Sequence, residues 1–364
     1  MKKQRALLAV VLLISIAAPA VAEDKVPRTP SGRPDLTGNY DAATLTPLQR
    51  PEEFGDNLEL TREQAEAIVE ENQKRRAARD ANRGPLTEAP PAGGAPPVGV
   101  GEEFLETSGA GSVGGYNNFW VDPGNDVFTI DGKFRTSIIV DPKNGRMPPM
   151  TEAARTRAME RSKLRRPNDG TAWWVELDGP GPYDGPEMLG IAERCILGFT
   201  GAAPTFPSLY NNFKRIVQTD DYVTILIEMV HDARIVRMSS QHPPAEVRKW
   251  LGDSIGWWDG DTLVVDTTNF LPQSGVRGGS ENAHIVERFT KLANGDVLYR
   301  FTVDDPTVWT ASWSGEYVWR ASEERVYEYA CHEGNYAMGN ILRGARLLEK
   351  EAIERAASGG DTGR

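Results

Sequence analysis

The chain has 364 residues, of which 39% are hydrophobic and nine are tryptophan, and its formal net charge is −11. This composition excludes wholesale disorder, because it provides enough apolar material for a core. The length fits two ordinary domains or one large all-β domain. The acidic balance excludes a simple electrostatic nucleic-acid binder, which needs an excess of Lys and Arg, so we predict no nucleic-acid partner.

The first 22 residues have the pattern of a secretory signal. Lys2, Lys3 and Arg5 form a basic start, an apolar run extends from Ala6 to Ala18, and Ala20-Val21-Ala22 offers small residues for cleavage. Three of the 41 basic residues and none of the 52 acidic residues lie there, so 38 basic residues remain and the mature chain carries a net charge of −14. No later apolar run is long enough to span a bilayer. The sequence therefore predicts a periplasmic or secreted protein with no transmembrane segment after signal removal.

Three segments are expected between the signal and the main body. Residues 23–60 are rich in Pro, Thr and Asp, which is typical of an extended N-terminal arm. Residues 61–83 begin with the capping-box pattern Thr61-x-x-Gln64 and carry a narrow apolar stripe, which predicts a helix. Residues 84–113 are rich in Pro and Gly and are expected to form a linker.

A β-rich domain is expected over residues 114–346, because all nine tryptophans lie within it, and a polar C-terminal tail is expected over 347–364. Four hairpins are predicted from short alternating segments that flank tight turns. Their turns are Asp131-Gly132, Asp220-Asp221, Asp259-Gly260 and Asn294-Gly295. Further strands are expected over 313–320 and 326–330, and a helix capped by Thr151 is expected over 151–165.

Eight or more antiparallel strands in one stretch of sequence favour a mainly β fold. We expect an antiparallel barrel of the lipocalin-like kind or a two-sheet sandwich. Closure into a barrel removes exposed strand edges, and about eight to ten strands leave room for one small ligand.

The two cysteines, Cys195 and Cys331, fit an exported protein. A bridge between them would close a loop of roughly 140 residues, for which chain-entropy models give about 4–5 kcal/mol. Two buried free thiols are the alternative, and a nucleophilic Cys331 beside His332 is a third. Since neighbouring residues of a strand point to opposite faces, His332 is badly placed to activate Cys331.

Two polar clusters at predicted strand ends are the candidates for catalysis. In the first, His231 is followed by Asp232 and Arg234, and in the second, His332 is followed by Glu333. An imidazole beside a carboxylate suits proton transfer near neutral pH, so the two histidines are the predicted general acid and base, oriented by Asp232 or Glu333. Arg234 is suited to clamp a carboxylate or to stabilise a developing anion.

Four further residues are predicted to bind substrate. Asn335 can donate to an oxyanion or a sugar hydroxyl, and Trp258 offers a flat apolar face to a sugar ring. Tyr336 and Arg300 are expected to complete the pocket. In the structural alternative, the first histidine cluster only satisfies a buried ion pair and His332 bonds a loop carbonyl.

No metal and no cofactor are predicted. Two histidines and two carboxylates can bind zinc or manganese, but adjacent His-Asp and His-Glu side chains diverge on a strand and no HExxH spacing occurs. The GxGxxG match at 109–114 does not follow a predicted strand, so it is a poor phosphate loop. The two remaining histidines are expected in ordinary positions, His242 in a loop before Pro243 and His284 at a solvated strand start.

Three stretches together carry a resemblance. They are Arg33–Gly38, Trp258–Thr267 and Tyr329–Tyr336. The combination resembles a group of exported bacterial proteins of unknown function. The resemblance implies a common β-rich fold and transfers no activity or catalytic residue.

The sequence leaves three functions open. The first is an exported enzyme that uses acid–base chemistry, hydrolysis or elimination, on a small organic or carbohydrate substrate in a barrel pocket. It requires His231 and His332 to open into one cavity. The second is a non-catalytic periplasmic ligand-binding protein, which requires an aromatic pocket without that pair. The third is an envelope-associated structural protein, which requires no pocket.

Overall fold

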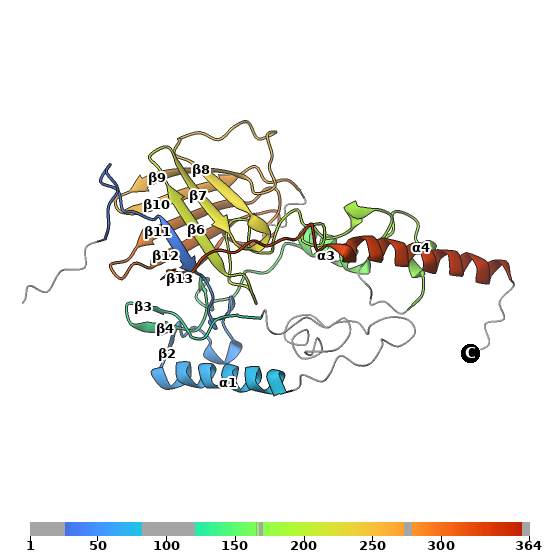
Figure 1. Cartoon of the computed structure of the whole chain (residues 1–364), viewed down its shortest axis with the longest axis horizontal. Coiled ribbons are helices and arrows are strands. Elements are labelled where there is room, and N and C mark those ends of the chain that lie inside the picture. Colours follow the sequence, from blue (N-terminus) through green and yellow to red (C-terminus); the bar gives the residue numbers. More distant parts are fainter. Residues whose placement is uncertain (1–25, 82–120, 165, 167–169, 273–278, 359–364) are drawn as a thin grey trace, which may run out of the picture.

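A closed barrel of nine strands dominates the molecule (Figure 1). The computed structural model describes residues 26–81, 121–164, 166, 170–272 and 279–358. The barrel order is β1-β6-β7-β8-β9-β10-β11-β12-β13, and β1 closes the ring by pairing with β13. The predicted antiparallel barrel is therefore confirmed, whereas the signal segment and the linker at 84–113 lie outside the described residues.

Eight of the nine neighbouring strand pairs are antiparallel. The strands are β1 (Gly38–Asp41), β6 (Phe213–Gln218), β7 (Tyr222–Ile227), β8 (Ala233–Arg237), β9 (Asp253–Asp259), β10 (Thr262–Thr268), β11 (His284–Lys291), β12 (Val297–Asp304) and β13 (Trp313–Ser322). The exception is the parallel pair β8–β9, in which Val236 lies opposite Ser254. A parallel pair needs a crossover, and residues 238–252 provide it.

Aromatic side chains fill the barrel. On β12, alternate residues point inward, as the period of a half-buried strand requires. Tyr299 lies at the centre, with its ring 5.0 Å from that of Trp319 and 5.3 Å from that of Tyr317. Gly315 has no side chain because a Cβ there would lie 2.4 Å from the ring of Phe301. Around Tyr299 and Phe301, side chains therefore fill the barrel interior.

The N-terminal arm covers one end of the barrel. Residues 26–37 run across its turns, where Arg28 pairs with Asp261 and the backbone N–H of Leu36 donates to Gln218 at 2.8 Å. Leu36 is fully buried. The arm thus seals the end at which β9 turns into β10.

Residues 198–207, which we call the plug, close the opposite end. Phe206 is buried and stacks on Trp313 with a ring separation of 6.3 Å. The backbone N–H of Thr205 donates to the hydroxyl of Tyr299 at 3.1 Å. The plug therefore belongs to the core, although it has no regular secondary structure.

A small second sheet joins the first long helix to the barrel. It contains β2 (Glu59–Leu60), β4 (Lys133–Arg135) and β3 (Thr129–Ile130), and α1 (Arg62–Ala81) lies beside it (Figure 1). The predicted capping box is present, because Gln64 N–H donates to the hydroxyl of Thr61 and Thr61 N–H donates to the side chain of Gln64. A further strand, β5 (Ile139–Asp141), pairs with β13.

The other helices differ in how well the sequence predicted them. The helix capped by Thr151 is present as α3 (Glu152–Lys163). Short 3₁₀ helices occur at Glu52–Phe54, Trp173–Glu176, Pro186–Met188 and Met229–His231. The strand expected over 326–330 is wrong, because β1 already occupies the edge of β13 and the closed ring offers no free edge.

Much of the C-terminal segment expected as a polar tail is helical. The helix α4 (Tyr336–Ala357) extends away from the barrel (Figure 1). Ala345, Leu348 and Ala352 form a stripe at helical spacing that packs around Trp174. This stripe extends on both sides of residue 347, where the tail was expected to begin.

A disulfide between Cys195 and Cys331 confirms one of the three alternatives left open by the sequence. It joins the segment that leads into the plug to the turn that leads into α4. The plug entrance is thereby tied to a residue 136 positions away in sequence.

We expect the paired substitution Cys195→Ser and Cys331→Ser to lower the free energy of unfolding by about 2–5 kcal/mol, because the unfolded chain regains the entropy of a long closed loop. Urea denaturation followed by tryptophan fluorescence measures this loss. Reduction of the wild-type protein should give a loss of similar size. Equal stability of the oxidised protein and the double variant would contradict the prediction.

Candidate functional site

The first predicted catalytic cluster bonds to the segment that leads into the second. His231 Nε2 accepts a hydrogen bond from the backbone N–H of Tyr329 at 2.8 Å. His332 is exposed in the turn before α4. Neither histidine lines the groove described below. Acid–base catalysis by this pair, with Glu333 as an exposed neighbour, stays a prediction.

Asp232 fastens the plug to the barrel. Its Oδ2 accepts the backbone N–H of Gly198 at 2.8 Å. A Cβ at Gly201 would lie 1.9 Å from the same oxygen, so only glycine fits there. Burial raises the pKa of Asp232 to about 6.

Arg234 is part of a buried ion pair inside the barrel. Both of its terminal nitrogens bond to the carboxylate of Glu287, one of them at 2.8 Å, and both side chains are at most 1% exposed. The hydroxyl of Tyr299 donates to the same carboxylate at 2.7 Å. These terminal nitrogens are therefore engaged within the protein, as the structural alternative for Arg234 requires.

The predicted substrate-binding residues are not brought together. Asn335 caps α4 by accepting the N–H of Met338, and Tyr336 next to it is 78% exposed. Trp258 lies at the opposite end of the barrel, with the guanidinium of Arg33 5.9 Å from its ring. Arg300 faces outward and pairs with Glu316 at 2.9 Å.

The sequence reasoning missed a buried lysine. Lys214 on β6 is fully buried, and its Nζ has no hydrogen-bond partner among the described residues. Burial lowers the pKa of Lys214 to about 7. Strand alternation could have found it, because Lys214 shares the inward face of β6 with Ile216.

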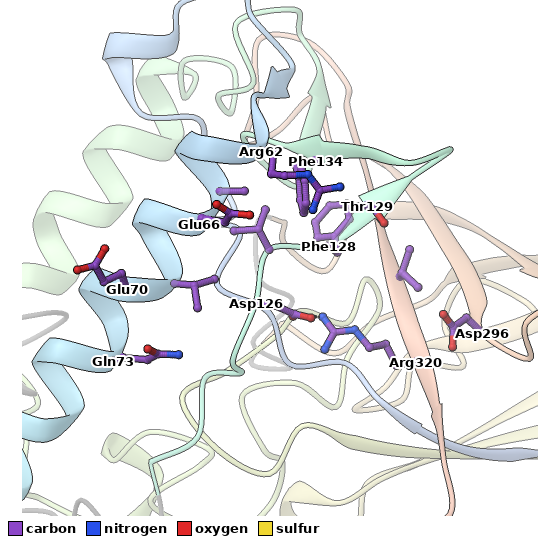
Figure 2. A pocket seen from close by; sticks show the side chains of 14 residues that line it. Arg62, Glu66, Glu70, Gln73, Asp126, Phe128, Thr129, Phe134, Asp296 and Arg320 are labelled. Atoms are coloured by element: carbon purple, nitrogen blue, oxygen red, sulfur yellow. Dashed lines mark hydrogen bonds and ion pairs between the residues drawn. The ribbon is translucent and has the colours of Figure 1, made fainter.

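A groove lies between α1 and the outer wall of the barrel (Figure 2). Its volume is about 480 Å³. Its apolar lining comes from the helix, from the segment leading into β3, from β4 and from β13. These residues are Ala65, Val69, Val127, Phe128, Phe134 and Val318.

The rim of this groove carries more negative than positive charge. Four carboxylates and two guanidinium groups line it. Arg62 lies over the ring of Phe134 at 5.8 Å, and Arg320 pairs with Asp126. Figure 2 shows Glu66 reaching from α1 into this space. Within the described residues Glu66 has no ion-pair partner.

A hydrogen-bonded network of two aspartates and two histidines lies on the outside of the barrel. From the sequence, the two histidines were expected to have no special role. His242 bonds Asp253 through Nδ1 at 2.9 Å and Asp266 through Nε2 at 3.0 Å. His284 bonds the other oxygen of Asp266 at 2.7 Å, and this bond raises the pKa of His284. This network bonds the crossover between β8 and β9 to the barrel wall.

We expect Arg234→Met to lower the free energy of unfolding by about 3–5 kcal/mol, because it leaves the Glu287 carboxylate buried without its partner. The double variant Arg234→Met with Glu287→Leu should lose much less. Urea denaturation of both single variants and the double variant forms a thermodynamic cycle. If Arg234→Met is as stable as the double variant, Arg234 and Glu287 are not energetically coupled and the prediction is wrong.

Asp253 should make stability depend on acid pH. Burial acts to raise its pKa, but hydrogen bonds from Lys249, His242 and Arg237 outweigh burial and hold the pKa at about 2. Because this folded-state pKa lies below the unfolded value of 3.8, the stabilisation is complete above that value and is lost as the pH falls through the folded pKa. The loss should reach about 2 kcal/mol between pH 5 and pH 2.

The measurement is urea denaturation across this pH range. Asp253→Asn should flatten the dependence, whereas the exposed control Asp178→Asn should keep it. An unchanged slope in the Asp253 variant would show that other carboxylates cause the acid sensitivity.

Other observations limit the kinds of site. In the parts of the chain that the structure describes, no helix has the length and apolar character needed to cross a membrane. Across the same residues, no group of three or more His, Cys, Asp or Glu side chains is placed to hold a metal ion. Comparisons with protein-family models, with curated proteins and with solved structures found no match.

Proposed function

We propose that the protein is a non-catalytic extracytoplasmic binding protein that holds a small organic cation with an apolar body in the groove between α1 and the barrel. The observation that carries this proposal is the groove itself. Its volume of about 480 Å³ lies within the range of small-molecule sites, about 300–1,000 Å³. A binding protein requires an aromatic pocket that lacks the His231 and His332 pair. The groove has an aromatic lining, and neither histidine lines it.

The apolar lining supports an aromatic or alkyl ligand body. Phe128 and Phe134 lie on the barrel side, and Val69 lies on the helix side. Burying roughly 100 Å² of apolar ligand surface contributes about 2.5 kcal/mol. This contribution alone gives weak binding, so a charged group must add to it.

The charge of the rim favours a cation. Arg320 is neutralised by Asp126, and Arg62 lies over the ring of Phe134. Because the rim has four carboxylates and only two guanidinium groups, its charge favours a cation over an anion. Glu70 pairs with Lys74 at 2.8 Å and is also engaged. Glu66 is left as the rim carboxylate best placed to meet an ammonium group.

An oxidising location is part of the proposal. The Cys195–Cys331 bridge supports it, because structural disulfides persist outside the reducing cytoplasm. The signal pattern in residues 1–22 points to the same compartment.

The test compares two probes of similar shape and opposite charge, 4-phenylbutylamine and 4-phenylbutyrate, by isothermal titration calorimetry. The amine should bind at least about tenfold more tightly, a difference of about 1.4 kcal/mol. Glu66→Gln should weaken amine binding several-fold. Glu71→Gln makes the same charge change on α1 outside the groove and should leave binding unchanged.

A steric variant separates the groove from the rest of the surface. Val69→Trp should fill the groove and abolish binding of the amine, while circular dichroism confirms that the barrel remains folded. Equal affinities for the two probes would overturn the choice of a cation. Amine binding that survives Val69→Trp in a folded protein would overturn the choice of this groove.

A further inference from the structure

The barrel interior contains an amine that neither the fold nor the groove uses. Lys214 has 0% of its surface exposed, and its Nζ has no hydrogen-bond partner among the described residues. Burying an ammonium group without partners costs several kcal/mol. A hydrophobic residue of similar length would fill the same space without that cost, so stability alone does not explain this lysine.

Carboxyl groups surround the amine but are held by backbone donors. Glu228, just after β7, and Asp232, just before β8, are two carboxylates whose charges act on the amine. Asp41 acts in the same direction, and the guanidinium of Arg234 acts in the opposite one. Glu228 accepts the N–H of Phe213 at 3.3 Å, and Asp232 accepts the N–H of Gly198 at 2.8 Å. Their charges favour the ammonium form of Lys214, yet burial outweighs them and lowers its pKa to about 7. Lys214 therefore changes protonation near neutral pH, and burial raises the pKa of Asp232 to about 6 and also raises the pKa of Glu228.

Other donors in this interior are also unpartnered. Arg234 Nε, Thr205 Oγ1 and Trp313 Nε1 are buried and have no hydrogen-bond partner among the described residues. Arg234 lies on β8, two strands from Lys214, and both side chains point inward. Because each unpartnered group can donate, a molecule with several acceptor oxygens suits this interior best.

We propose that Lys214 is the nucleophile for reversible imine formation with a small 2-oxo acid or aldehyde acid. An amine that is neutral, desolvated and free of hydrogen bonds is the form that attacks carbonyl carbon. The carboxylate of such a ligand would accept hydrogen bonds from the unpartnered donors. This activity is separate from ligand binding in the groove.

The reaction balances without an oxidant. The lone pair of Lys214 Nζ forms the C–N bond, and the carbonyl oxygen takes a proton from the carboxyl group of Asp232 or Glu228. Nitrogen loses one proton to that carboxylate, which gives a neutral carbinolamine. Its hydroxyl then takes a second proton from the same carboxyl group and leaves as water while the nitrogen lone pair forms the C=N bond. The second proton of nitrogen returns to the carboxylate. One amine and one carbonyl compound give one imine and one water.

The plug controls access to this site. It is anchored to Asp232 through Gly198 and lies next in sequence to the Cys195–Cys331 bridge. A ligand must therefore enter through movement of the plug. Asp232 serves both as an anchor of the plug and as a proton donor.

The test traps the imine in the full-length oxidised protein with glyoxylate and cyanoborohydride at pH 7, followed by peptide mass spectrometry. Labelling of Lys214 should exceed that of any exposed lysine, such as Lys133, by at least about tenfold. The neutral fraction of an amine with a pKa near 7 is about a thousand times that of an ordinary lysine at this pH, which leaves a wide margin for slow entry.

Three comparisons make the outcome decisive. The labelling rate at Lys214 should rise through pH 7 and level off, and Asp232→Asn should slow it several-fold. Glycolaldehyde, which lacks the carboxylate, should label Lys214 more slowly than glyoxylate. Lys214→Met removes a buried charge, so it should fold and should lose only this one label. Labelling of exposed lysines with Lys214 unmodified, or equal labelling of Lys214 and Lys133, would overturn the proposal.

Discussion

Closure of the strand ring is the constraint on which the rest of the molecule depends. Because β1 pairs with both β6 and β13, the wall has no free edge, and every inward side chain must find its partner inside. Most of this interior is apolar, and aliphatic and aromatic side chains pack together in it. One charged pair there, Arg234 with Glu287, is satisfied by two ion-pair contacts and by Tyr299, whereas Lys214 Nζ has no hydrogen-bond partner among the described residues. The plug and the arm then seal the two ends.

A sealed interior moves the accessible binding space to the outside of the barrel. Residue Arg135 of the small sheet reaches Glu316 on the outer face of β13 at 3.4 Å, and Arg300 bonds the same carboxylate. This clamp holds the small sheet against the wall. The sheet in turn positions α1, whose first turns pack through Ala65 and Ile68 while Val69 remains in the groove. The groove thus exists because the small sheet holds α1 at a distance from the barrel wall.

Much of this fold could be predicted because its signals are local. Asp259-Gly260 and Asn294-Gly295 mark hairpins by their turn chemistry alone, and alternation along β12 identifies its inward face. The disulfide stayed one of several alternatives, since pairing depends on distance in space and not on spacing in sequence. The groove could not be predicted from the sequence for the same reason. Its lining residues Val69, Phe134 and Val318 come together only when the helix, the small sheet and the barrel have assembled. Lys214 was overlooked because a charged residue in a strand suggests an outward position, although its alternation with Ile216 indicates the opposite.

The two proposed sites differ in the charge that they require, and this difference follows from where they lie. Outside the wall, water screens the rim carboxylates of the groove, so their excess negative charge costs little and selects a cation. Inside, there is little water to stabilise charge, and buried groups such as Lys214 Nζ, Arg234 Nε and Trp313 Nε1 are donors without a partner among the described residues. An acceptor-rich ligand satisfies such donors, whereas an organic cation adds a second uncompensated charge. A molecule suited to one site is therefore poorly suited to the other, and a ligand that occupied both would contradict the electrostatic basis of each assignment.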